Sequence, residues 1–362
     1  MRYITILVFV LLAQSASGLD LVRIDAVQKS DIRMLDRLGV IVNQVHPDHI
    51  VAEISKDMYG TIADRGFNVE LIQEDITEVY RQNSLTESTR SSYLTYDQFV
   101  DSMIDMATAY PQICRLDTLG YSHLNRLLLV MKISDSVWVD ENEPEVLFEG
   151  NIHGDEKIGW AMCMWMVRYL LENYPTDTLV QRLVDSREIW IAPLVNPDGF
   201  VNNIRYNSRS VDLNRNWGWA WGDEYSCGTD FFSENESRRF VENLWNRGFV
   251  TYVSYHAGTL CISEPWSYTG YVAPPEVVLI HHLSQGYAVT TNYPYGQGAL
   301  VMYPINGCTK DYGYGNAGVI SWSIEVCNYK TPSPDSIDSI WQRERPAMLW
   351  LMHKAGQGIH GY

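Results

Sequence analysis

The 362-residue sequence predicts an α/β protein with a mostly parallel mixed, twisted sheet, helices on both faces, and a small N-terminal α+β domain. From residue 93 onward, short apolar runs of strand length alternate with longer segments of helix length, which favours a parallel sheet covered on both faces. Residues 19–76 carry a separate, shorter alternation that would be marginally stable alone. At 46% hydrophobic and 20% charged residues, the chain is too apolar to be disordered.

Residues 1–18 are expected to be a secretory signal peptide. Arg2 supplies the positive charge, residues 3–13 form an apolar stretch, and residues 16–18 are small, as cleavage requires. The apolar stretch is shorter than a bilayer span, and no later segment reaches about 18 uninterrupted apolar residues. We therefore expect a secreted protein, extracellular or periplasmic, with no membrane span after signal cleavage.

The N-terminal module at residues 19–76 is predicted to alternate strands with helices. Its strand patterns lie at residues 21–26, 50–54 and 68–72, and its helical patterns at residues 29–38 and 56–64. Residues 77–92 are polar and lack a hydrophobic period, which predicts a linker. Arg81 and Arg90 in this linker are candidate processing sites, and an inert linker accounts for them equally well.

The main domain is expected at residues 93–355. Its predicted strands are residues 127–133, 145–149, 188–194, 249–255 and 319–326. Its predicted helices are residues 96–110, 158–173, 233–247, 277–287 and 336–354. Ligands bind such sheets at the carboxyl ends of the strands, and His153 and His256 both follow predicted strands.

The chain carries 27 Lys+Arg against 44 Asp+Glu, a formal net charge of -17. So acidic a chain is a poor match for a phosphate backbone, and nucleic acid is excluded as a partner. Its six cysteines could pair in 15 ways in an exported protein, and the sequence does not choose among them. Cys163 lies in an apolar helical run and is expected to be a buried free thiol. No feature indicates an oligomer, and we take the chain to be a monomer.

Three residues form a candidate metal site. His153 and Glu156 stand three residues apart at a predicted strand-to-helix turn, a spacing that lets an imidazole and a carboxylate reach one ion. His256, at the end of another predicted strand, supplies a third ligand. Two His and one Glu are a ligand set of hydrolytic zinc, which keeps its fourth position for water. Taken alone, the His-x-x-Glu spacing is weak evidence, and a structural role stays open.

Residues 205–217 form an arginine-rich polar loop between these ligands. Several arginines suit an anionic ligand, because a guanidinium grips a carboxylate through two parallel bonds. A surface salt-bridge network would account for any single arginine equally well. Glu325 lies in a predicted strand of otherwise apolar or small residues. A carboxylate there is unfavourable unless it is paired, ligated or functional.

Taken together, these residues resemble the zinc metallocarboxypeptidases of the carboxypeptidase A type over residues 93–355. The resemblance rests on motifs that occur in the family's order, namely residues 151–156 (NIHGDE), 195–199 (VNPDG), 211–217 (VDLNRNW), 233–237 (SENES), 254–256 (SYH) and 303–325. It implies a carboxypeptidase-type α/β/α fold and a secreted zinc enzyme that hydrolyses the C-terminal bond of peptides or proteins. The His-Gly-Asp-Glu motif looks closer to the regulatory and bacterial branches than to the digestive one.

The resemblance also implies a role for each site residue. The two histidines and Glu156 would bind one zinc ion per chain, and Glu325 would act as general base and acid. Asn214 and Arg215 would hold the C-terminal carboxylate of the substrate, and Tyr303 would fold over it. Arg205 would stabilise the oxyanion, with Arg209 as the rival for this role.

The same resemblance addresses specificity. Lys310 falls at the base of the specificity pocket, where a cation should favour acidic C-terminal residues. Ser267 stands where the basic-specific branch has an aspartate. Two readings compete with this preference: Lys310 points to solvent, or it pairs with Asp311 or another acid. Asp155 stands where digestive members usually carry arginine, which argues against a secondary anionic subsite there.

Alternatives remain for the ends of the chain and for function. Residues 19–76 occupy the place of the family's pro-domain, which implies a zymogen, and a permanent accessory module is the alternative. Residues 356–362 are a tail or the start of a further β-domain. One rival function is an amidase of the same chemistry that acts on cell-wall muropeptides. The other is a non-catalytic peptide- or glycan-binding protein that uses a tryptophan-rich surface of Trp217, Trp219, Trp221 and Trp266.

Overall fold

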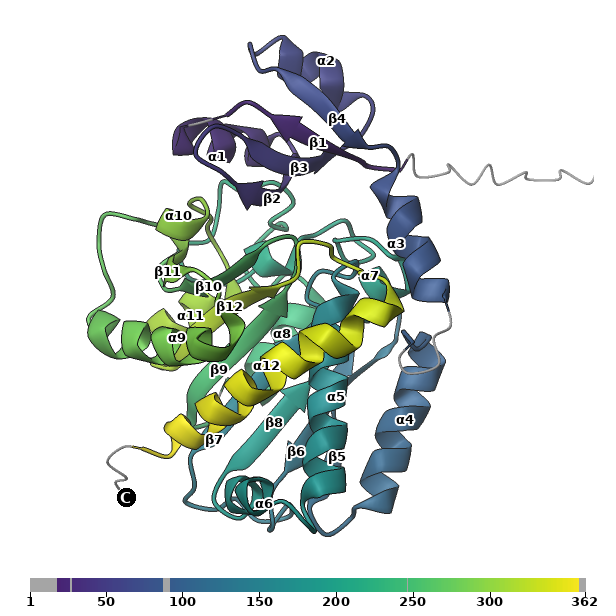
Figure 1. The fold of residues 1–362 in the computed structure, drawn as a ribbon, viewed down its shortest axis with the longest axis vertical. Coiled ribbons are helices and arrows are strands. Elements are labelled where there is room, and N and C mark those ends of the chain that lie inside the picture. The colour runs from purple at the N-terminus through teal and green to yellow at the C-terminus, as the bar shows by residue number, and fades with distance from the viewer. Residues whose placement is uncertain (1–17, 27, 87–91, 246, 358–362) are drawn as a thin grey trace, which may run out of the picture.

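The computed structural model describes residues 18–26, 28–86, 92–245 and 247–357, as a large α/β domain with a small module above it (Figure 1). The expected signal peptide up to residue 17, residues 87–91 of the linker with Arg90, and residues 358–362 of the tail lie outside the described residues. Among the residues described, none of the helices combines the length and the apolar character needed to cross a membrane.

The module is an antiparallel sheet with two helices. Its elements are β1 (Asp20–Ile24), α1 (Lys29–Arg37), β2 (Ile41–Val45), β3 (Ile50–Ile54), α2 (Met58–Ala63) and β4 (Val69–Gln73), with strand order β2-β3-β1-β4. Strand β2 was not predicted, because a register shift between Val42 and Gln44 breaks its alternation. The module has its own apolar core, which also takes in Tyr303 of the large domain.

Helix α3 (Ile76–Leu85) follows the module and overturns part of the linker prediction. The Asp75 carboxylate caps it by accepting a hydrogen bond from the Glu78 backbone N–H at 3.1 Å. Ile76 and Tyr80, four residues apart, are the buried side chains of this helix. Two buried positions are too few to produce a hydrophobic period, so the sequence pattern concealed the helix.

The large domain is built on a mixed sheet, as predicted. In the described chain its eight strands are ordered β11-β10-β12-β9-β7-β8-β6-β5. They are β5 (Cys114–Tyr121), β6 (Leu127–Ile133), β7 (Glu145–Gly150), β8 (Glu188–Ala192), β9 (Phe249–His256), β10 (Leu260–Glu264), β11 (Tyr295–Gln297) and β12 (Ile320–Val326). The central strands β12, β9, β7 and β8 are mutually parallel. Strand β10 runs antiparallel to β12, while β6 pairs antiparallel with β8 and with β5.

Helices cover both faces of this sheet, which confirms the predicted fold class. One face packs against α4 (Tyr96–Ala109), α5 (Lys157–Asn173), α6 (Thr178–Val184), α9 (Val277–Thr291) and α12 (Pro334–Ala355). The other packs against α8 (Asn235–Asn243), the 3₁₀ turn η1 (Leu213–Arg215) and part of α11 (Thr309–Ala317). The short helices α7 (Pro197–Asn202) and α10 (Gly298–Val301) complete the domain.

The cysteines are unpaired in this structure. All six are free, and Cys163 is fully buried in α5, as its apolar surroundings predict. The carboxyl ends of β7, β9 and β12 meet below the module, and this edge carries the residues described next (Figure 1).

Candidate active site

One cavity of about 60 Å³ gathers the residues selected from the sequence. Its walls include His153, Glu156, Arg205, Asn214, Arg215, His256, Ser267, Tyr303, Lys310 and Glu325. Val42 and Asn43 of β2 also line it, so the module closes the cavity from above. Residues that were selected from the sequence, and that lie up to 172 positions apart in the chain, therefore line one small cavity.

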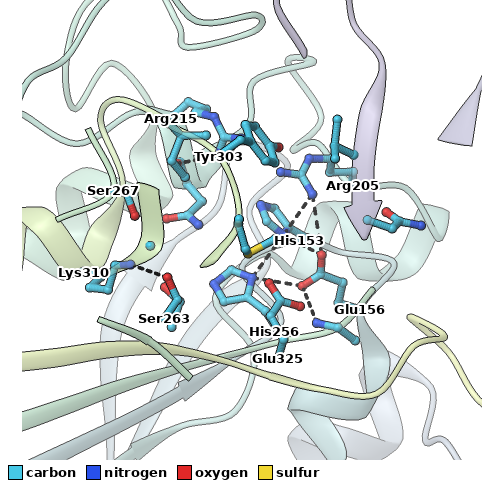
Figure 2. Close-up of a pocket in the computed structure, with 18 residues that line it drawn as sticks. His153, Glu156, Arg205, Arg215, His256, Ser263, Ser267, Tyr303, Lys310 and Glu325 are labelled. Carbon is cyan, nitrogen blue, oxygen red and sulfur yellow. Dashed lines mark hydrogen bonds and ion pairs between the residues drawn. The ribbon is translucent and has the colours of Figure 1, made fainter. Parts of the chain in front are cut away.

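The candidate metal ligands come from three elements. His153 lies in the turn after β7, Glu156 precedes α5, and His256 ends β9. Their ligand atoms all lie within 4.8 Å of one another. The Glu156 carboxylate is 2.7 Å from His153 Nδ1 and 3.0 Å from His256 Nδ1, as Figure 2 shows. A Cβ on Gly154 would lie 2.1 Å from the backbone of Gly199, so the turn needs glycine there.

The donor set fits a zinc ion. Two imidazoles and a carboxylate are zinc ligands, whereas magnesium and calcium prefer oxygen alone. Asp212 lies 3.2 Å from His153 Nε2, which turns Nδ1 of that ring toward the other two ligands. Burial opposes the charge of Asp212, but Arg205 and His153 more than offset this and hold its pKa well below the usual range. Asp212 is therefore ionised, and its carboxylate orients the His153 ring.

Arg205 rather than Arg209 reaches the candidate metal site. The Arg205 Nη1 atom lies 3.5 Å from Glu156 Oε1 (Figure 2). The other guanidinium nitrogens of Arg205 hold Asp212 at 2.8 and 2.9 Å. Arg209 instead lies 3.7 Å from Glu234, with 44% of its side chain exposed. The Arg205 guanidinium is thus placed to meet negative charge that develops beside the ligands.

Glu325 lies on β12 directly beside His256 of β9, in parallel register. Burial raises the pKa of Glu325 to about 7; His256 and Arg205 oppose this rise, and Glu156 adds to it. A carboxyl group with a pKa near neutrality can both accept and donate a proton at physiological pH. Its place on the cavity wall next to the ligands suits a proton carrier.

The predicted carboxylate-binding residues meet a carboxylate of the module. The Tyr303 hydroxyl donates to Asp36 Oδ1 at 3.0 Å, and Arg215 Nη2 lies 3.5 Å from the same oxygen. The Asn214 side-chain oxygen accepts from the Thr309 backbone N–H at 3.0 Å. Burial disfavours the charge of Arg215, but Asp212 and Asp36 outweigh it and raise the pKa of this guanidinium.

Lys310 is fully buried on α11 and lines the cavity. Its Nζ donates to Ser263 Oγ at 2.6 Å (Figure 2) and to the Glu264 carbonyl at 3.0 Å. The Asp311 carboxylate instead accepts from the backbone N–H groups of Ser267 and Tyr268. Lys310 therefore neither points to solvent nor depends on Asp311 for a partner, in contrast to the two competing readings.

Asp155, between the ligands of the His-x-x-Glu motif, faces the module. Lys330 Nζ lies 3.1 Å from Asp155 Oδ2 and 2.7 Å from Glu53 Oε2 on β3. All three side chains are buried. Burial alone would lower the pKa of Lys330, but the carboxylates of Asp155 and Glu53 outweigh this effect and raise it. The ammonium group therefore stays charged.

The tryptophan-rich surface proposed for a binding protein is formed only in part, because two of its four tryptophans are buried while Trp219 and Trp221 are partly exposed. Trp217 is completely buried and Trp266 is 6% exposed. Trp219 stacks on Trp266 with ring centroids 5.1 Å apart. This stacked pair lines an open pocket of about 410 Å³, whereas Trp217 packs into the core, where its ring removes a large apolar area from water.

Three residues at the site escaped sequence-based selection. Asp212 lies inside one of the family motifs but carries no spacing signal of its own. Asp36 belongs to the module, and Lys330 follows β12. For these last two no local pattern indicates a role, because their partners come from distant segments.

The fold is similar to that of solved carboxypeptidases. The carboxypeptidase A of Helicoverpa armigera superposes with a TM-score of 0.82 and 19% identity, over 94% of this chain and 98% of the other. Thrombin activatable fibrinolysis inhibitor superposes with a TM-score of 0.78 and 16% identity, over 94% of this chain and all of the other. At this coverage the likeness includes most of the N-terminal module.

Curated relatives match in sequence. Carboxypeptidase SOL1 of Arabidopsis thaliana is 29% identical over 291 residues, which are 76% of this chain and 58% of the relative. A zinc carboxypeptidase of Saccharothrix mutabilis subsp. capreolus is 39% identical over 160 residues, 40% of this chain and 36% of the relative. The chain thus spans about half or less of the length of these relatives. The zinc carboxypeptidase family model matches residues 99–347, more than half of the chain, so the chain belongs to the zinc carboxypeptidase family.

Proposed function

We propose that this chain is a secreted, zinc-dependent metallocarboxypeptidase that removes the C-terminal residue of peptides or proteins. The observation that carries the proposal is the pairing, in one cavity, of a zinc-type ligand triad with a buried arginine already engaged by a carboxylate. A chain end bears such a carboxylate, whereas an internal peptide bond does not. The proposal of export rests on the apolar stretch in residues 1–18.

Each cavity residue has a part in this chemistry. A zinc ion held by His153, Glu156 and His256 would lower the pKa of a bound water and polarise the peptide carbonyl. Glu325 takes the proton from the water and delivers it to the leaving amine. Arg205 stabilises negative charge on the carbonyl oxygen. We propose one zinc ion and one such site per chain.

The far end of the cavity selects the substrate. Arg215 and Asn214 hold the C-terminal carboxylate, and Tyr303 covers it. Lys310 uses two of its three N–H groups on Ser263 and Glu264, which leaves one for an anionic side chain. A buried cation in this position favours C-terminal Glu or Asp and repels Lys or Arg. Ser267 adds a hydroxyl to the same wall.

The N-terminal module keeps the enzyme latent in this proposal. Asp36 occupies the place of the substrate carboxylate by binding both Tyr303 and Arg215. Strand β2 narrows the remaining space. A substrate can enter only when the module has moved, so residues 19–76 act as a pro-domain rather than as a permanent accessory module.

A panel of peptides that differ only at the C-terminal residue tests the function. The protein, freed of residues up to about 90, is assayed on peptides that end in Glu, Asp, Phe or Lys and on an amidated Glu peptide. We expect a chelator to abolish hydrolysis, the amide to resist, and Glu to be removed fastest. Chelator-resistant hydrolysis contradicts the zinc mechanism, and removal of Phe or Lys as fast as Glu contradicts the role of Lys310.

A further inference from the structure

The buried carboxylate of Glu149 lies behind the candidate ligand His256. Glu149 is on β7, and its register partner on the parallel neighbour β9 is Ser254. Side chains two residues apart on a strand share a face, so Ser254 and His256 point to the same side of the sheet. Glu149 is 1% exposed, Ser254 is completely buried, and His256 is 2% exposed. All three side chains therefore meet in a closed space on one face.

Hydrogen bonds connect these side chains. The Ser254 hydroxyl lies 3.1 Å from His256 Nε2, and Ser254 is the register partner of Glu149, so the two side chains are neighbours on the same face. The hydroxyl of Tyr252, two residues back on the same strand, donates to the Glu149 carboxylate at Oε1. Glu149 does not line the cavity with the candidate ligands, and the Ser254 hydroxyl, its neighbour on β9, is the group that reaches His256.

The directions of these bonds form one consistent chain. Tyr252 donates to the Glu149 carboxylate, and when the Ser254 oxygen accepts the proton of His256 Nε2, the Ser254 O–H is left to turn toward its neighbour Glu149. The proton then sits on Nε2, and the Nδ1 lone pair faces Glu156 and His153. Asp212 fixes the ring of His153 in the same sense by direct contact. Each histidine ring thus has a carboxylate on the side away from the other ligands: Asp212 contacts His153 directly, and Glu149 acts on His256 through the Ser254 hydroxyl.

We propose that Glu149 is a positioning residue that, through Ser254, fixes the tautomer and orientation of His256 for metal binding. The proposal rests on the zinc site described under the proposed function. Ligand-orienting partners of this kind change metal affinity by about 10- to 100-fold when they are removed. Because Glu149 acts on His256 through Ser254 and not by direct contact, we expect its removal to change metal affinity by the lower end of this range.

Zinc affinity tests the proposal without reference to activity. The full chain and its Glu149→Gln and Ser254→Ala variants are titrated with zinc against a competing chelator, and visible spectra of the cobalt-loaded proteins report ligand geometry. We expect about tenfold weaker zinc binding for Glu149→Gln and about 10- to 100-fold for Ser254→Ala. The double variant should lose no more than the larger single effect, because both act on one contact.

Glu344 provides a matched control. It is also completely buried and accepts from two tyrosine hydroxyls, Tyr287 at 2.8 Å and Tyr293 at 2.5 Å, on the opposite face of the sheet. Glu344→Gln should lower thermal stability as Glu149→Gln does, and leave zinc affinity and the cobalt spectrum unchanged.

The outcomes separate the two proposals. If the wild-type chain does not bind zinc, the proposed function fails. If the wild-type chain binds zinc and both Glu149→Gln and Ser254→Ala bind it equally well, the positioning role is wrong. Equal losses of affinity in Glu149→Gln and Glu344→Gln overturn it too, since they mark a general loss of packing. Should Glu149→Gln fail to fold, Ser254→Ala decides alone, because it removes the hydroxyl through which Glu149 acts.

Discussion

The Asp36 carboxylate gives a quantitative test of latency. Asp36→Ala leaves Arg215 and the Tyr303 hydroxyl buried without the acceptor they share. Breaking a buried ion pair typically costs about 3–5 kcal/mol. Asp212, 4.0 Å from Arg215 Nη1, still balances part of the charge, so we expect docking of the module to weaken by about 2–3 kcal/mol. Since 1.4 kcal/mol is tenfold, the fraction of molecules with an open cavity should rise about 30- to 140-fold.

The assay is the rate at which the intact, zinc-loaded chain hydrolyses a peptide with C-terminal Glu. Asp36→Asn keeps an acceptor for the Tyr303 hydroxyl but no charge, so its activity should fall between wild type and Asp36→Ala. Asp57→Ala is the control, because Asp57 is an exposed residue at the start of α2 whose side chain forms no cap hydrogen bond. The reasoning is refuted if intact Asp36→Ala is no more active than wild type at equal zinc content.

Three further changes probe the site and the fold. Glu325→Gln should lower kcat by about 10²- to 10⁴-fold while zinc content, measured by atomic absorption, is unchanged; a loss of zinc would mean a structural role instead. Lys330→Met leaves two buried carboxylates unpaired and should reduce the free energy of unfolding by about 3–5 kcal/mol in denaturant melts. Lys56→Met, which breaks an exposed pair, should cost less than about 1 kcal/mol, and similar costs for the two variants would contradict the expectation. Partial burial, helped by neighbouring acids, raises the pKa of Glu143 to about 7, so the folded chain loses stability between pH 4.5 and about 7 as this group ionises. Glu143→Gln should therefore raise the unfolding midpoint at pH 8 and leave it unchanged at pH 4.

The chemistry of the site was accessible from sequence because it is encoded locally. His153 and Glu156 are fixed by a turn, and His256 and Glu325 by the ends of two strands that the hydrophobic pattern reveals. Once those strands are parallel neighbours, their carboxyl ends must lie together. The role of Arg205 rather than Arg209 was left open, because both stand in one polar loop and only the fold decides which reaches the ligands.

The parts that escaped sequence-based prediction depend on tertiary contacts. Helix α3 buries only Ile76 and Tyr80, so it shows no period, and β2 is interrupted by a register shift. The contact between Asp36 and Tyr303 joins residues 267 positions apart, and no local pattern in the sequence indicates such a pairing. Propensity and spacing act over a few residues, whereas these features follow from how the module packs on the large domain.

The charges between the module and the cavity explain why an acidic chain can keep a cationic site closed. Two of the cations in the cleft face module acids, Arg215 with Asp36 and Lys330 with Glu53. Lys310 bonds only to neutral oxygens of its own domain. In the proposed function the module would therefore fill the place of the substrate carboxylate but would leave Lys310, the cation proposed to contact the C-terminal side chain, without an acidic partner. Under the proposed function, substrate and module would compete for Arg215 and Lys310 would favour only the substrate, so an acidic chain end should gain an advantage in this competition that an apolar one lacks.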